Sequence, residues 1–130
     1  SPAGYQMLAR FQLASLAAKQ GDLDSAIGAY KNLADDDGIA AVYQDLAVVL
    51  GAFAELDAKS EGAGLVARAN ELASSSTSWR FFAKEVGALA ALKNGDTKKA
   101  RIRYEELSKE AAAPQGLRAR AQSMLDVLTE

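Results

Sequence analysis

Apolar residues recur along this chain at spacings of three and four, the period of an α-helix with one buried face. Clusters of glycine, aspartate and serine interrupt the pattern and mark helix ends. The pattern predicts seven helices, over residues 5–20, 22–35, 39–57, 61–74, 78–94, 96–112 and 114–129. Their short connections predict antiparallel hairpins over 5–35, 39–74 and 78–112, followed by a single helix at 114–129.

Two segments of the chain match each other at an offset of 74 residues. The matching positions are Gly21, Asp22, Ala26, Tyr30 and Leu33 in the first segment and Gly95, Asp96, Ala100, Tyr104 and Leu107 in the second. The offset is twice 37, and a weaker copy lies midway. Steps of 37 residues give three columns of small residues: Ala14, Gly51 and Ala88; Ala17, Ala54 and Ala91; Ala26, Ala63 and Ala100. Because small residues let helix backbones approach closely, the columns predict stacked hairpins.

The turns agree with this repeat. Gly21 and Gly95 each end an apolar-periodic helix, where a left-handed residue is common. Asp22 and Asp96 follow at once and are predicted N-caps of the next helix. The middle copy lacks this Gly-Asp pair, and we expect Ser60 to be its cap within a looser turn over 57–62.

The last predicted helix differs from the other repeat-starting helices because Leu125 stands where they have alanine or glycine. Pro114 fits its first turn. Its apolar side, formed by Leu117, Ala121, Met124, Leu125 and Leu128, is predicted to cover the preceding hairpin. Its polar side carries Arg118, Arg120, Gln122 and Asp126. Such an amphipathic terminal helix is typical of a cap.

These residues resemble the tetratricopeptide pattern of a small residue, a turn glycine, an alanine and an aromatic. The resemblance is carried by Ala14, Gly21, Ala26 and Tyr30, and again by Ala88, Gly95, Ala100 and Tyr104. The middle copy keeps only Gly51 and Ala63, and the first two copies lack the usual Trp and Pro. The resemblance implies an all-α fold of antiparallel helix hairpins, stacked as a short right-handed tetratricopeptide-like superhelix with a C-terminal capping helix. We expect a single domain over 1–130.

Over residues 5–129 the chain also resembles the C-terminal domain of bacterial ancillary SecYEG translocon subunits, notably at Tyr43-Gln-Asp-Leu-Ala and Trp79-Arg-Phe. The resemblance implies a soluble domain behind an N-terminal membrane helix, at the periplasmic face of the inner membrane. It also implies contact with the translocon or a periplasmic chaperone. Without such an anchor we expect a cytoplasmic protein, and the absence of cysteine fits either compartment.

Composition narrows the classes of function. The chain has no histidine and no cysteine, which removes the usual nucleophilic triads, zinc sites and thiol chemistry. A net charge of −2 disfavours nucleic acid as a ligand. Acidic side chains outnumber basic ones in residues 1–78, and basic ones outnumber acidic ones in residues 79–130. This asymmetry indicates either an ordinary solvated surface or a domain that orients toward a charged partner. We therefore expect no enzyme, no cofactor and no bound metal.

Several local motifs admit two interpretations. Asp35-Asp36-Asp37 lacks the remaining ligands of a calcium loop, and we interpret it as a helix end. The Gly62-Ala-Gly-Leu-Val-Ala67 segment, with Glu85 downstream, follows no strand and fails as a dinucleotide site. The apolar run Leu46–Ala54 is too short to span a bilayer. Trp79, Phe81 and Phe82 are either buried or a partner-binding anchor, whereas Tyr30 and Tyr104 are predicted packing residues.

The predicted function is non-catalytic protein binding on a concave face formed by the first helix of each hairpin. Its predicted lining is Leu8, Phe11, Gln12, Ser15 and Lys19, then Asp45, Val48, Ala52 and Glu55, then Phe82, Glu85, Leu89 and Lys93. Lys19 and Lys93 would orient acidic groups of an extended or helical peptide, and Glu55 and Glu85 its basic groups. The alternatives are a self-associating scaffold domain of a cell-envelope complex and an enzyme that uses carboxylates alone.

Overall fold

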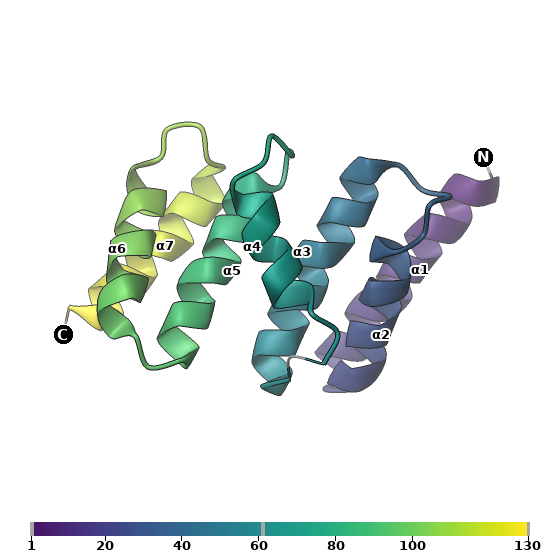
Figure 1. Ribbon diagram of the computed structural model, residues 1–130, viewed down its shortest axis with the longest axis horizontal. Coiled ribbons are helices and arrows are strands. Elements are labelled where there is room, and N and C mark those ends of the chain that lie inside the picture. The colour runs from purple at the N-terminus through teal and green to yellow at the C-terminus, as the bar shows by residue number, and fades with distance from the viewer. Residues whose placement is uncertain (1, 61, 130) are drawn as a thin grey trace. The chain divides into compact units, whose positions relative to one another are not determined.

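The computed structural model describes residues 2–60 and 62–129, and within them the chain is helical, as predicted (Figure 1). The helices are α1 (Pro2–Lys19), α2 (Leu23–Ala34), α3 (Ala41–Ala58), α4 (Leu65–Ala73), α5 (Arg80–Lys93), α6 (Thr97–Lys109) and α7 (Gln115–Leu128). These described ranges contain no strand. The all-α prediction is confirmed, and the stacking of the hairpins as a superhelix stays a prediction.

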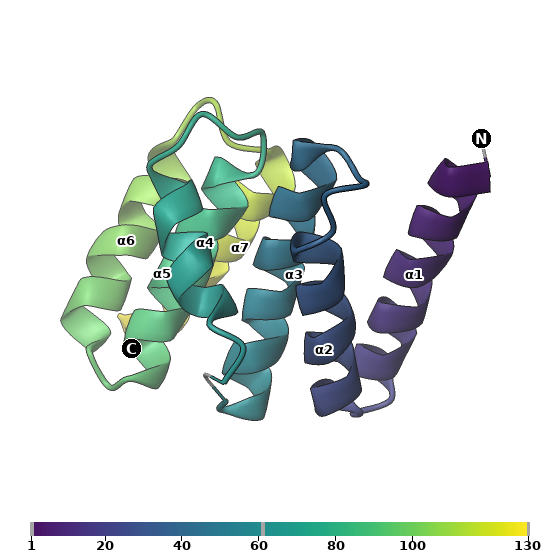
Figure 2. The same cartoon turned by 45° about the vertical axis from the view of Figure 1, so that its right-hand side comes forward.

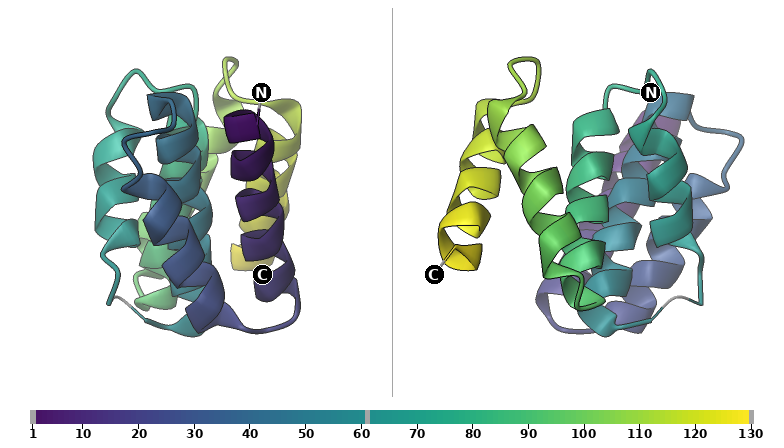
Figure 3. Two further views of the ribbon diagram at one scale, coloured as in Figure 1. Left: turned by 90° about the vertical axis from the view of Figure 1, so that its right-hand side faces the viewer. Right: turned by 60° about the vertical axis from the view of Figure 1, so that its left-hand side comes forward.

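The chain divides into two compact units, residues 1–68 and residues 69–130, which we call the N-terminal and the C-terminal unit. In the N-terminal unit α2 packs between α1 and α3, and Figure 2 shows α1 lying beside α2. In the C-terminal unit α6 packs against both α5 and α7, which also contact each other. Figure 3 shows α7 alongside α6. The expectation of one domain over 1–130 stays a prediction.

The Gly-Asp turns form as the sequence predicts. Gly21 and Gly95 have φ of +81° and +82°, the left-handed conformation that costs glycine little. Asp22 accepts the amide of Ser25, and Asp96 accepts that of Lys99 at 3.1 Å, so both aspartates cap the following helix. These two turns therefore fix the geometry of the first and third hairpins.

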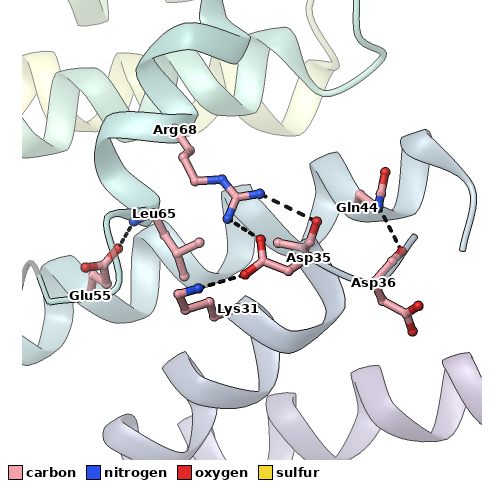
Figure 4. A network of polar contacts seen from close by, with 8 residues as sticks. Lys31, Asp35, Asp36, Gln44, Glu55, Leu65 and Arg68 are labelled. Carbon is pink, nitrogen blue, oxygen red and sulfur yellow. Dashed lines mark hydrogen bonds and ion pairs between the residues drawn. The ribbon is translucent and has the colours of Figure 1, made fainter. Parts of the chain in front are cut away.

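The middle turn is built differently, and the prediction of Ser60 as its cap is wrong. Helix α4 begins only at Leu65, and the Ser60 hydroxyl accepts the amide of Gly62 instead. The predicted start of this helix, Glu61, lies outside the described residues. The side chain that caps α4 belongs to Glu55, in the last turn of α3. Its Oε1 accepts the amide of Leu65, as Figure 4 shows, and the amide of Val66 at 3.1 Å.

Lys59 ends α3 with φ 56° and ψ 41°, the left-handed conformation that Gly21 and Gly95 adopt in the other copies. A Cβ makes this conformation costly. We expect Lys59→Gly to raise the free energy of unfolding by about 0.5–1 kcal/mol. Urea denaturation measures the change. An unchanged or lower value would contradict a strained lysine at this position.

The small columns are largely buried. Ala14, Ala26, Ala88 and Ala100 are fully buried, and Gly51 is buried as well. A Cβ added to Gly51 would overlap Leu65 Cδ1 and lie 2.9 Å from Tyr30 Cβ. The glycine thus allows α3 to approach both α2 and the start of α4.

The terminal helix α7 covers the C-terminal unit as predicted. Leu117, Ala121 and Leu125 are buried in one cluster with Tyr104 and Leu107 of α6, and Met124 and Leu128 are partly buried against it. Pro114 precedes the first helical residue, one position earlier than predicted. An apolar side packed on α6 therefore holds α7 in place.

Candidate partner-binding groove

A groove in the N-terminal unit lies between α1 and α3 and is floored by Tyr30 of α2. Its lining residues from α1 are Met7, Leu8, Phe11, Gln12, Ser15, Leu16 and Lys19, and those from α3 are Tyr43, Leu46 and Leu50. All five residues predicted from the first helix are among them. These five residues therefore line a groove, while the concave face of a stacked array and their binding role stay predictions.

The prediction for α3 is wrong in register. Val48, Ala52 and Glu55 are buried, and Asp45 is half-buried without lining the groove. Counting from the columns of small residues gave the wrong face of α3. The groove-facing residues of α3 are Tyr43, Leu46 and Leu50, a stripe at i, i+3 and i+7 that was visible in the sequence.

The groove exposes large apolar side chains. Leu8 is 54% exposed, Leu16 50% and Tyr43 41%. Phe11 and Tyr30 form its floor, with ring centroids 6.4 Å apart. Burial raises the pKa of Tyr30, so its phenol stays neutral. Concentrated apolar exposure in one concavity is typical of a surface that another chain covers.

The equivalent positions in the C-terminal unit, 74 residues later, are closed by an ion pair. Phe11 corresponds to Glu85, and Leu46 corresponds to Arg120. The guanidinium of Arg120 donates two bonds of 2.9 Å to the Glu85 carboxylate, which joins α5 to α7. This bond raises the pKa of Arg120. Sequence analysis missed the pair because its members lie 35 residues apart in no motif.

The Glu85 carboxylate already pairs with Arg120 of the same chain. This pair corrects the prediction that Glu85 orients the basic groups of a bound peptide. Phe82 is partly buried against the cluster of the C-terminal unit and contacts Trp79 at a centroid distance of 5.8 Å. Leu89 is half-buried and Lys93 exposed. Phe81 is buried, which favours packing over a binding anchor. Burial, with the Glu85 charge as a lesser cause, raises the pKa of Tyr104 to about 12.

Two of the three aspartates at 35–37, Asp35 and Asp36, are joined to the surrounding helices. Asp35 pairs with Lys31 and Arg68, each at 2.7 Å, and Figure 4 shows both contacts. These partners hold the pKa of Asp35 below its usual value. Arg10 of α1 pairs with Asp36 at 2.6 Å and lowers the pKa of that carboxyl too.

The Asp36 carbonyl accepts the Gln44 side chain of α3 at 2.8 Å, so the 35–37 loop links α1, α2, α3 and the start of α4. Because Asp35, Asp36 and their cationic partners are partly exposed, the ion pairs orient side chains more than they stabilise the fold. The interpretation of Asp35-Asp36-Asp37 as a helix end fits this arrangement. Within 2–60 and 62–129, no group of three or more acidic side chains is arranged to hold a metal ion.

A second hollow, in the C-terminal unit, is lined by residues of α4, α5 and α6 with charges of both signs. Two of its cations are already engaged. Arg103 donates to the Gly87 carbonyl at 3.0 Å, and Lys109 pairs with Glu105 at 2.9 Å. Because Arg103 and Lys109 bond to neighbouring groups, we assign these two residues a structural role.

Comparison of the chain with known protein families, with curated proteins and with solved structures found no match. In the described part of the chain, no helix combines the length and the apolar character needed to cross a membrane. The groove of the N-terminal unit is therefore identified as the candidate site by its geometry alone.

Proposed function

We propose that this chain is a non-catalytic protein-interaction domain whose groove in the N-terminal unit binds a segment of a partner protein. The observation that carries the proposal is the exposure of Leu8, Leu16 and Tyr43 on opposite walls of one groove. Leaving such side chains in water is unfavourable, and covering them contributes about 25 cal/mol for each Å² of apolar surface. A bound segment supplies that cover.

The repeat family, the cellular location and the partner are part of the same proposal. They rest on the resemblance of residues 5–129 described above. We propose tetratricopeptide-like hairpins stacked as a right-handed superhelix, in a domain anchored at the periplasmic face of a bacterial inner membrane. Its partner would be the translocon or a periplasmic chaperone. Buried Tyr30 and Tyr104, at equivalent repeat positions, are consistent with this family.

Photo-crosslinking in cells tests the binding role. Benzoylphenylalanine is placed at Leu16 in the groove or at Ile102 on α6, since both side chains are 50% exposed. We expect a discrete protein adduct from position 16 and none from position 102. The adduct should disappear when Tyr43→Asp is added on the opposite wall. Equal adducts from both positions, or an adduct at 16 that survives Tyr43→Asp, would contradict binding in the groove.

The second candidate function is self-association. It is favoured by Tyr5 and Leu13 of α1, which are 78% and 66% exposed and lie outside the groove lining. The same crosslinking experiment separates the two functions. An adduct at twice the mass of the chain would replace the binding role by self-association.

A further inference from the structure

The groove carries a single charge on an otherwise apolar and neutral lining. Lys19, in the last turn of α1, is the only cation or carboxylate among the described residues that line it. Among the described residues no ion pair engages its ammonium group. An apolar surface with one unpaired cation at its end favours an apolar ligand with an acidic group at the matching end.

The walls of the groove also select the conformation of the ligand. They are helices, whose backbone N–H and C=O groups bond within each helix, and the lining adds few other hydrogen-bonding groups, such as Gln12 and Ser15. An extended peptide would therefore bury backbone groups without partners, at a cost of roughly 1–3 kcal/mol each. A helix satisfies its own backbone and presents only side chains.

The C-terminal unit provides an internal comparison. There the two positions equivalent to Phe11 and Leu46 hold the Glu85–Arg120 ion pair, which ties α5 to α7. No equivalent bond is possible between Phe11 and Leu46. Among the described residues, α1 and α3 also do not pack against each other as α5 and α7 do. The groove between α1 and α3 thus remains open to an apolar side chain from outside.

We propose that the occupant of this groove is an amphipathic helix of another protein. Its apolar residues at i, i+4 and i+7 enter between α1 and α3, and an acidic residue beyond them pairs with Lys19. The inference rests on the proposed function and specifies its ligand. Apolar anchors set the affinity, and the Lys19 pair sets the direction of the helix.

Peptide titration by fluorescence anisotropy tests the inference. The probe is an alanine-rich helix of about 15 residues with leucines at i, i+4 and i+7. A glutamate stands one turn beyond the leucines at each end, so that either direction places an acid near Lys19. Matched peptides carry glutamine or lysine at both places. We expect the glutamate peptide to bind the full chain roughly threefold more tightly than the glutamine peptide.

Two variants complete the test. Lys19→Glu should reverse the preference, so that the lysine peptide binds best. Leu16→Asp should weaken every peptide by about tenfold or more, while Ile102→Asp, at equal exposure, should leave binding unchanged. Equal affinities for all three peptides would overturn the role of Lys19.

Absence of binding by any helix, together with a groove-dependent adduct at position 16, would overturn the helical ligand and leave the binding function standing. If no helical peptide binds and no adduct forms at position 16, both proposals are overturned. An adduct composed of two copies of the chain would replace the foreign helix by self-association.

Discussion

Replacing Glu55 with alanine is expected to lower the free energy of unfolding by about 3 kcal/mol. Its carboxylate is almost completely buried and accepts the amides of Leu65 and Val66, which begin α4. Alanine leaves those two donors without their acceptor, removes a negative charge from a helix N-terminus and opens a cavity. Urea denaturation followed by circular dichroism measures the loss.

Glu55→Gln is the matched control, since its amide oxygen can still accept both amides. We expect it to cost about 1 kcal/mol, because the charge is lost and the geometry kept. Equal losses from both variants would indicate that the two hydrogen bonds that glutamine can keep contribute little. The groove role first predicted for Glu55 implies the opposite result, a loss of partner binding at unchanged stability.

Gly51→Ala is expected to lower the free energy of unfolding by about 2 kcal/mol, since the added methyl group would press on Leu65 and Tyr30. Gly28 in α2 is the matched control. It is exposed, and a Cβ added there meets nothing within 4 Å. Gly28→Ala should therefore raise stability by about 0.5–1 kcal/mol through helix propensity alone. A gain in both variants would contradict a close approach of backbones at Gly51.

The parts of the fold that follow from local chemistry were predictable from the sequence. Gly21 and Asp22, and again Gly95 and Asp96, form their turn and cap within a few residues of each other, so that spacing alone identifies them. The buried side of α7 follows equally from its helical period. Such features depend on neighbours along the chain, which a sequence displays directly.

The features that the sequence analysis missed depend on contacts across the chain. Glu55 caps a helix whose first residue lies ten positions away, on the far side of a degenerate turn. The side of α3 that faces the groove depends on which of its positions other parts of the fold cover. Its i, i+3, i+7 stripe marked one candidate side, but Val48 and Ala52 are apolar too and are buried. Periodicity shows that a helix has an apolar side, but it does not show which other element packs against that side.

Helix α1 has one buried residue among those described, Ala14, and packs on α2 alone to any large extent. An element held by so few contacts opens locally more readily than the core helices, so its amides exchange hydrogen with solvent faster. One wall of the groove is consequently adaptable, and any ligand that seats there must restrict its motion. Occupancy then becomes measurable as slowed deuterium uptake along residues 2–19, with residues 97–109 as an internal reference.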